Sequence, residues 1–455
     1  MESRYAETTP PERMATPERA RRCGDWLRRW LFAAWVCACA GVAGYLVKQQ
    51  SWGWLATRFL NERVIEYIGG TGYVLFDAEE LARNYWRTAR LDKVDPAPYR
   101  DYLRTLAERR QPVPATPRPR KHVVYVQMES ADGLLIGARW EGRPAMPFLE
   151  SLAREQVYLP NVIDNTAGGR TNDALVLVQT ALVPLRSSPV YVSQPLDKVP
   201  SLPKALKAAG YHTWLMNGYF GAFGRSRLAQ QALGYDDGFF SEELDTSEKL
   251  GWGVSDRSVL HQAAQRLIAA KQPTFAHVIL LTNHHPYVYV REHLGLPPAG
   301  IVADYVQSVR YMDESIAGFF GELKAAGVLD NCIVAIFGDH DSSITAQLER
   351  ELQVGPARVM SDTVPLIVAG LPEAPRRIEA VAGLQDVPVI VLEALGLPVP
   401  PTFTGNGLGG GGRTVAAMYG ALEVTPQGLG ASPMPVDQET LTLLALHYPE
   451  KLLAP

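Results

Sequence analysis

The chain has 455 residues, 20% of them charged, and a formal net charge of −4 at neutral pH. This length is enough for a large core and for more than one structural unit. Because the net charge is slightly negative, the chain as a whole has no positive potential that would attract nucleic acid, and we therefore exclude nucleic acid as a partner. Of the four cysteines, only Cys332 follows residue 39. No disulfide is therefore expected within the long remainder of the chain.

The N-terminal region predicts a membrane anchor. Residues 1–25 are polar and rich in arginine and proline, which is typical of a disordered tail. Residues 26–48 are predicted to form a transmembrane helix, because no charged residue occurs from Leu31 to Val47. A cleaved signal peptide is the alternative, although the bulky residues near the end of this run make a poor cleavage site.

Charge on the two flanks of the apolar run predicts its orientation. Six arginines between residues 13 and 29 precede the run, whereas fewer cationic residues follow it closely. The positive-inside rule therefore places the N-terminus in the cytoplasm and the rest of the chain outside. In a bacterium this predicts a single-pass protein of the inner (cytoplasmic) membrane with a periplasmic or extracellular catalytic domain.

The next segments predict a stalk and then an α/β domain. Residues 49–120 read as a helical juxtamembrane stalk that ends in the proline-rich linker PVPATPRPR. From residue 121, buried apolar runs alternate with amphipathic helical segments, which is typical of βαβ units. We expect a mainly parallel sheet flanked by helices over residues 121–415, followed by a C-terminal tail with a helix over 416–455. The apolar runs are HVVYVQM, HTWLM, FAHVILLT, CIVAIFG and VPLIVAG.

Chemically useful side chains follow four of these apolar runs. Open α/β sheets bind ligands at the carboxyl ends of their strands, so we expect these side chains to converge there. One such strand end would carry little weight, because Asp and Asn are common in turns. Four together indicate a functional site. The residues are Glu129, Phe223, Arg225, Asn283, His284, His285, Asp339, His340 and Asp341.

The stretch TAGGRTNDAL places Thr171 at the start of an apolar helical run. One interpretation is a helix N-cap, the usual role of a threonine at this position. The other is a nucleophile, presented by a glycine-rich loop beside free backbone N–H groups that favour anions. The polar strand ends elsewhere in the chain favour the nucleophile.

Together these residues allow metal-assisted attack at phosphorus. Glu129, the Asp339-His340 pair and the Thr171 oxygen form a mixed oxygen and nitrogen set for Mn²⁺, Mg²⁺ or Zn²⁺. A metal would lower the pKa of the Thr171 hydroxyl and screen phosphoryl oxygens, which Arg225 could also hold. Two acidic residues have other interpretations. Asp256 is either a helix N-cap or a substrate contact, and Asp313 is structural.

The ordered motifs MES, GGRT, NHHPY, YVQSVRYMDESIAGFF and IFGDHD resemble those of a known enzyme group. This group comprises the lipoteichoic acid synthases and phosphoglycerol transferases of the alkaline phosphatase/sulfatase superfamily, and the resemblance covers roughly residues 121–415. It implies a superfamily fold and one divalent metal, Mn²⁺ by preference, bound by Glu129, Thr171, Asp339 and His340. It also implies that Thr171 is the nucleophile.

The resemblance further implies that the enzyme moves glycerol phosphate from a phosphatidylglycerol-type lipid to an envelope glycan or glycerol-phosphate acceptor. A threonine-linked intermediate would form, and Arg225 and His284 would hold the head group. Phe223 lies in Ala-Phe-Gly-Arg where the family often has Trp-Asn-Arg, so we expect Phe223 to form a smaller wall of the pocket. Alternatives are a phosphoethanolamine transferase, a phosphodiester or sulfate ester hydrolase, and an inactive envelope scaffold.

Overall fold

A computed structural model describes most of the chain, which divides into two compact units, residues 1–56 and 57–455. Within the first unit, residues 29–39 are helical. No helix among the described residues is both long and apolar enough to cross a membrane. The predicted span over 26–48 lies partly outside the described residues. These are residues 26, 29–39, 61–110, 112, 118, 120–168, 170–186, 189–354, 362–409, 415–417, 422–425, 428–433 and 435–453.

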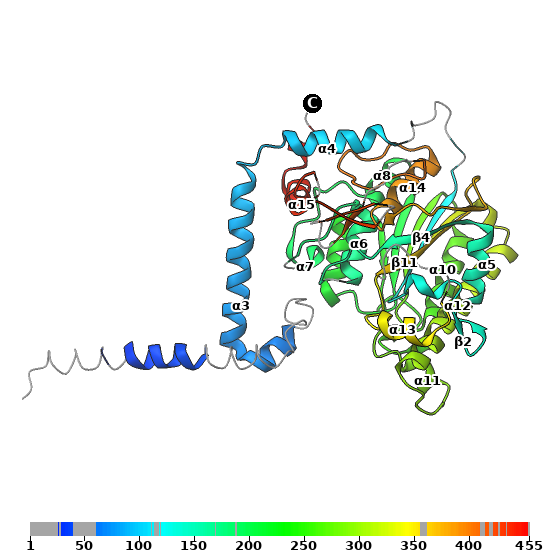
Figure 1. The fold of residues 1–455 in the computed structure, drawn as a ribbon, viewed down its shortest axis with the longest axis horizontal. Coiled ribbons are helices and arrows are strands. Elements are labelled where there is room, and N and C mark those ends of the chain that lie inside the picture. Colours follow the sequence, from blue (N-terminus) through cyan, green and yellow to red (C-terminus); the bar gives the residue numbers. More distant parts are fainter. Residues whose placement is uncertain are drawn as a thin grey trace, which may run out of the picture. The chain divides into compact units, whose positions relative to one another are not determined.

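The second unit is built on a nine-stranded sheet (Figure 1). Its strand order is β12-β4-β11-β10-β1-β9-β5-β6, and β13 also pairs with β4. The four central strands β10, β1, β9 and β5 run parallel, as the sequence predicts. The strands are β1 (His122–Met128), β4 (Val157–Ile163), β5 (His212–Asn217), β6 (Asp237–Phe239), β9 (Thr274–Ile279), β10 (Cys332–Gly338), β11 (Thr363–Ala369), β12 (Arg376–Arg377) and β13 (Ala382–Gly383).

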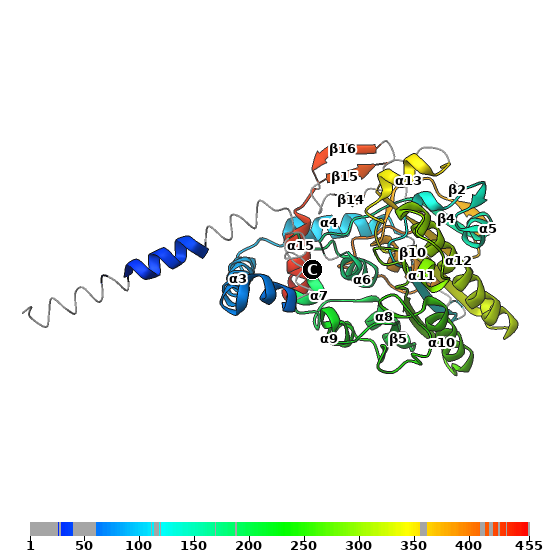
Figure 2. The same cartoon turned by 90° about the horizontal axis from the view of Figure 1, so that it is seen from below.

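Helices cover both faces of the sheet, which explains why its four central parallel strands are continuous apolar runs. Along β1, Val123 and Tyr125 belong to one buried core, and Val124 and Val126 to the other. Figures 1 and 2 show α5, α10 and α12 grouped on one side of the sheet. These helices are α5 (Pro147–Glu155), α10 (Asp256–Ala269) and α12 (Ile301–Ala325).

The other core contains residues of several helices, and four of them come from distant parts of the chain. They are α6 (Thr171–Thr180), α8 (Leu202–Ala208), α14 (Asp386–Leu395) and α15 (Gln438–His447). Five shorter helices complete the layers around the sheet. They are α7 (Val190–Ser193), α9 (Ser226–Ala232), α11 (Tyr289–His293), α13 (Thr345–Glu351) and α16 (Pro449–Leu453).

Two long helices, α3 (Asn61–Leu91) and α4 (Ala97–Glu108), occupy the range of the predicted stalk. Both contribute to the unit that contains the sheet, because Leu91 and Leu103 belong to its core. Arg87 of α3 also lies 3.6 Å from Glu439 of α15. The stalk range therefore packs against the C-terminal helices.

Three features of the sheet and its surroundings were not predicted. Strand β4 interrupts its apolar run with Pro160 and Asn161, yet it pairs with β11. Strand β11 runs antiparallel to both β10 and β4, so the sheet is mixed on this side. A separate three-stranded antiparallel sheet consists of β14 (Val415–Ala417), β15 (Leu422–Thr425) and β16 (Gly428–Pro433).

Candidate active site

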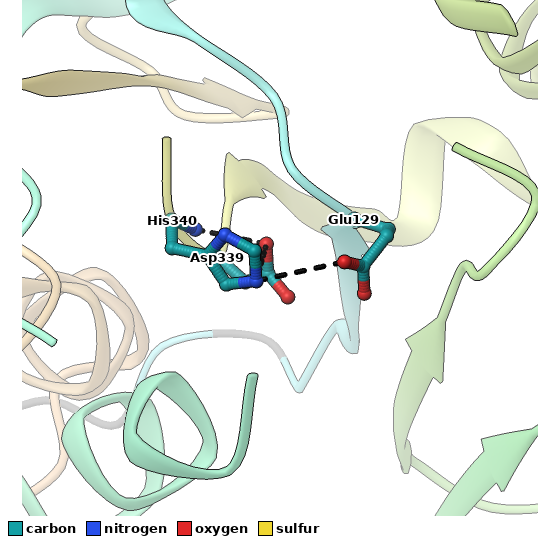
Figure 3. A group of neighbouring side chains, drawn as sticks. All are labelled: Glu129, Asp339 and His340. Carbon is teal, nitrogen blue, oxygen red and sulfur yellow. Dashed lines mark hydrogen bonds and ion pairs between the residues drawn. The ribbon is translucent and has the colours of Figure 1, made fainter. Parts of the chain in front are cut away.

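Parallel pairing of β1 and β10 brings two predicted carboxylates to the same edge of the sheet. Met128 pairs with Gly338 at the ends of these strands, and the next residues are Glu129 and Asp339. The Asp339 backbone N–H donates to the Met128 carbonyl at 3.0 Å, which continues the strand contact by one residue. Both carboxylates are almost completely buried, and they lie close together with His340 (Figure 3).

Backbone groups fix the orientation of Asp339 and His340. Asp339 Oδ1 accepts N–H bonds from Ser130 at 2.9 Å and from His340 at 2.8 Å. His340 Nδ1 lies 2.8 Å from the Asp341 carbonyl. Because a carbonyl only accepts, Nδ1 carries the proton and Nε2 is left as a ligand atom. His340 Nε2 lies 3.5 Å from Glu129 Oε1 and 3.6 Å from Asp339 Oδ1.

The Thr171 hydroxyl points at this cluster. Its Oγ1 lies 3.3 Å from Glu129 Oε2 and 3.3 Å from His340 Nε2. Helix α6 begins at Thr171 and Arg170 is its N-cap residue, with no side-chain capping bond. The interpretation of Thr171 as an N-cap is therefore wrong. Arg170 has the unusual φ of 46°, and this turn directs the first residue of α6 toward the carboxylates.

Glu129, Asp339 and His340, which we call the metal corner, suit a divalent cation. Each offers one ligand atom, and these atoms all lie within 4.8 Å of one another. Asp339 Oδ2 is buried without a hydrogen-bond partner, as expected of an atom that binds a metal. Two carboxylates, an imidazole nitrogen and a nearby hydroxyl oxygen match the ligand preferences of Mn²⁺, Mg²⁺ and Zn²⁺.

Burial and neighbouring charges shift the pKa values of Asp339 and His340. Burial raises the pKa of Asp339 to about 7, and the Glu129 carboxylate adds to this while His340 opposes it. Burial lowers the pKa of His340, but the carboxylates of Asp339 and Glu129 outweigh burial, and the net direction is upward. A bound cation would favour the ionised carboxylate and the neutral imidazole instead.

A cavity of ≈ 310 Å³ opens beside the metal corner. Its lining includes Glu129, Thr171 and His340. Phe223, Trp252 and His284, which we call the head-group wall, also line it. The predicted residues Phe223 and His284 thus share one cavity with the predicted nucleophile.

Of the three predicted substrate-binding residues, Arg225 is the one that the structure does not place in the lining of this cavity. Its side chain is exposed, and Nη1 donates to the Val192 carbonyl at 3.0 Å. Its contact with substrate stays a prediction. Phe223–Arg225 form a 3-10 turn directly before α9. Arg225 therefore follows Phe223 of the head-group wall by two residues in the sequence.

The sequence analysis missed Arg170 as a lining residue. Its guanidinium lies 2.7 Å from Asp341 Oδ1 and donates to Ser343 Oγ at 2.6 Å. Its position directly before Thr171 was the signal available in the sequence. Asp341, which we left out of the metal set, therefore contacts the arginine beside the nucleophile.

Two other acidic residues support the site or the fold from a distance. Ser255 is the N-cap of α10, and Asp256 Oδ1 accepts the N–H groups of Leu281 and Thr282 at 2.8 and 3.0 Å. The interpretation of Asp256 as an N-cap is therefore wrong. Asp313 accepts the N–H groups of Phe148 and Leu149 at the start of α5, which confirms its structural role.

A largely parallel sheet with a carboxylate and imidazole cluster at its carboxyl edge defines the alkaline phosphatase/sulfatase class of α/β proteins. A solved structure with this fold is the lipoteichoic acid synthase LtaP from Listeria monocytogenes, with a TM-score of 0.61 and 19% identity. The alignment covers 73% of this chain and 90% of that chain.

A family model described as Sulfatase matches residues 121–397, which is more than half of the chain. The chain therefore belongs to the sulfatase family. Lipoteichoic acid synthase 2 from Bacillus subtilis is 25% identical over 358 residues, covering 75% of this chain and 55% of the relative. Lipoteichoic acid synthase 1 from the same organism is 27% identical over 297 residues, covering 63% and 46%. This chain thus matches about half the length of these relatives.

Proposed function

We propose that this protein is a metal-dependent phosphoglycerol transferase that uses Thr171 as its nucleophile. The observation that carries the proposal is the position of Thr171, whose Oγ1 lies 3.3 Å from both Glu129 and His340 and which lines the cavity. The family and its relatives named lipoteichoic acid synthase support the same reaction class. Manganese, magnesium or zinc would be held by Glu129, Asp339, His340 and Thr171.

The reaction would proceed in two displacements at phosphorus. Thr171 Oγ1 attacks the phosphorus of a phosphatidylglycerol-type lipid, and the diacylglycerol oxygen leaves and takes up a proton. Glycerol phosphate is then linked to Thr171 until the hydroxyl of a glycan or a glycerol-phosphate chain displaces the threonine. A divalent metal held by Glu129, Asp339, His340 and Thr171 would lower the pKa of the Thr171 hydroxyl and neutralise charge on the phosphoryl oxygens.

Arg170 and the start of α6 would stabilise the negative charge that develops during both displacements. Arg170 is held by Asp341 and Ser343, so its guanidinium is positioned before the substrate arrives. The N–H groups of the first turn of α6 favour an anion beside Thr171. Among the described residues, Arg170 and these N–H groups are the cationic and dipolar groups nearest to Thr171 in the sequence.

The walls of the cavity favour a neutral head group over an ammonium head group. Glu129 is the only carboxylate among the described residues that line the cavity, and it belongs to the metal corner. The rings of Phe223 and Trp252 lie 6.2 Å apart and edge to face, while His284 covers the indole of Trp252. The Trp252 face is thus occupied by a neighbour, and it offers no open aromatic cage for a cation.

A side-by-side lipid assay tests this function. The full chain is incubated with Mn²⁺ and vesicles of phosphatidylglycerol or phosphatidylethanolamine, and diacylglycerol release is measured. We expect release from phosphatidylglycerol, loss of release on chelation, and little reaction with phosphatidylethanolamine. Equal consumption of both lipids would contradict the assignment and favour a phosphoethanolamine transferase.

We also propose that the chain is anchored in a bacterial inner membrane with the catalytic domain on the outer side. The uncharged run from Leu31 to Val47 and the arginine-rich segment before it support this topology. An alkaline phosphatase reporter fused after Pro455 should be active, and a reporter that works only in the cytoplasm should be silent. The reverse pattern would overturn the topology.

A further inference from the structure

A short hairpin with the sequence Gly-Trp-Gly at its tip enters the wall of the cavity. The hairpin pairs β7 (Lys249–Leu250) with β8 (Gly253–Val254) and leaves Trp252 at the turn. The sequence analysis considered this segment only for Asp256. The structure shows that its tryptophan, and not its acid, lines the cavity.

The two glycines hold the hairpin tip in close contact with neighbouring elements. Gly251 has a φ of +71°, and a Cβ there would lie 2.7 Å from Cδ2 of Tyr289 on α11. A Cβ on Gly253 would overlap the carbonyl of Gly218, which directly follows β5. Any larger residue at either position would push the tip away from α11 or from β5. The position of Trp252 is therefore fixed by backbone packing.

Trp252 lies against the imidazole of His284. Their ring centroids are 3.9 Å apart and the ring planes differ by 30°. The indole is fixed in turn, because Trp252 Nε1 donates to the Tyr289 hydroxyl at 3.0 Å. Tyr219 and Phe223 pack around the same indole with centroids 5.6 and 6.2 Å away.

The stacking leaves one nitrogen of His284 for a ligand. His284 Nδ1 lies 3.0 Å from the His285 carbonyl, so Nδ1 donates its proton to that oxygen. The indole covers one face of the ring. Nε2 is the polar ring atom that remains for the donor lipid.

The same segment also holds the backbone that leads to His284. Asp256 Oδ1 accepts the N–H groups of Leu281 and Thr282, three and two residues before His284. The intervening Asn283 donates to the carbonyls of Glu129 at 3.0 Å and Ser130 at 3.2 Å. The segment 249–256 thus acts on His284 in two ways. Asp256 fixes the backbone before His284, and Trp252 contacts the imidazole itself.

We propose that Trp252 is a positioning residue, which holds the His284 imidazole so that Nε2 faces the head group of the donor lipid. The proposal rests on the proposed function, because it assigns His284 to the head group. Trp252 acts by limiting the rotamers of His284 before the lipid binds, and preorganised contacts of this kind improve use of the substrate.

A spectroscopic experiment tests the stacking without any assay of activity. The full chain is labelled at histidine, and the His284 ring resonances are assigned by comparison with His284→Gln. Stacking on an indole shifts these resonances upfield, and Trp252→Ala should move them to the positions of an unstacked histidine. Trp252→Phe should retain part of the shift. Resonances that do not respond to Trp252→Ala would overturn the proposal, whatever lipid the enzyme uses.

A double-mutant cycle tests whether Trp252 acts through His284. We expect Trp252→Ala to lower kcat/KM for phosphatidylglycerol about threefold to tenfold, mainly through KM, the range for losing one aromatic pair. In the His284→Ala background the same change should have almost no effect. Equal losses in both backgrounds would show that Trp252 does not act through His284.

Two controls separate this role from general destabilisation and from failure of the proposed function. Trp140→Ala removes another half-buried tryptophan that is absent from the cavity lining, and it should leave kcat/KM unchanged. Trp252→Phe should recover most of the activity. A wild-type protein with no activity on phosphatidylglycerol would refute the proposed function, while the His284 resonances would still decide the stacking.

Discussion

The metal corner and the head-group wall belong to one cavity, but their side chains are held in different ways. Glu129 and Asp339 follow two paired central strands. Backbone N–H groups orient Asp339, and the Asp341 carbonyl orients the His340 ring. Phe223 and His284 lie in turns, and their rings contact Trp252 and, for Phe223, Tyr219. The metal corner depends on the sheet itself, whereas the head-group wall depends on side-chain packing between loops.

This difference predicts how each region tolerates change. A strand end fixed by sheet pairing places its side chain in the same position whatever substrate is used. Loops that pack through rings can change composition and still fold. A substitution in the metal corner should therefore abolish most of the turnover. A substitution in the head-group wall should change the use of the donor lipid only moderately.

The largest effect is expected from Thr171→Ala. Removal of a nucleophile should lower kcat by at least about 10³-fold, with subtilisin as a precedent for still larger losses. Thermal unfolding should stay close to wild type, because the hydroxyl does not cap α6. Thr171→Ser, which retains a hydroxyl, is the matched control and should keep measurable turnover. Near-normal turnover of Thr171→Ala would refute the assignment of the nucleophile.

Asp339→Asn should weaken Mn²⁺ binding more than about 100-fold, a loss at least as large as that for outer-shell partners of a metal. Titration calorimetry on the purified chain measures this directly. The matched control is Asp341→Asn, two residues away, because Asp341 contacts Arg170 and is not in the metal corner. Unchanged Mn²⁺ affinity in Asp339→Asn would remove that residue from the ligand set.

Metal affinity should also depend on pH in a direction set by Asp339. Burial raises the pKa of Asp339 to about 7, so protons compete with the metal below that pH. The apparent affinity for Mn²⁺ should therefore fall on acidification, and the His340 imidazole, whose pKa is also raised, carries a second proton that the metal must displace. Calorimetry between pH 5 and pH 8 would test the sign, and affinity that rises on acidification would contradict it.

The smallest effect is expected from Arg225→Ala. Its side chain is exposed and already donates to Val192, so its loss should raise KM for phosphatidylglycerol about tenfold with little change in kcat. Arg227→Ala is the neighbouring control, because Arg227 pairs with Glu243 and is absent from the cavity lining. Equal kinetic effects of the two substitutions would remove Arg225 from the head-group contacts.

The parts of the fold that were predicted have strong local signals. Strands β1, β5, β9 and β10 are apolar runs because both faces of the sheet are covered, and each ends in polar residues. Strand β4 was missed because Pro160 and Asn161 interrupt its run. The register of β4 against β11 shifts between Val364 and Leu366, opposite this part of β4, and Asn161 donates to the Glu379 carbonyl.

The remaining features depend on contacts that local sequence does not specify. The apolar run of β11 is compatible with either strand direction, so its antiparallel pairing could not be predicted from composition. Trp252 lies 32 residues before the histidine on which it stacks, and no periodic pattern connects them. The position of Thr171 at the start of a helix, in contrast, was predicted correctly, because a glycine pair precedes it and an apolar helical run follows it.

Mass spectrometry of the chain trapped without an acceptor tests the central claim most directly. The full chain would be incubated with phosphatidylglycerol and Mn²⁺, quenched and digested, with Thr171→Ala treated in parallel. We predict glycerol phosphate on the peptide that contains Thr171, its absence in Thr171→Ala, and its loss when an acceptor alcohol is added. Release of diacylglycerol with glycerol phosphate on another residue, or with no modified peptide at all, would contradict the account.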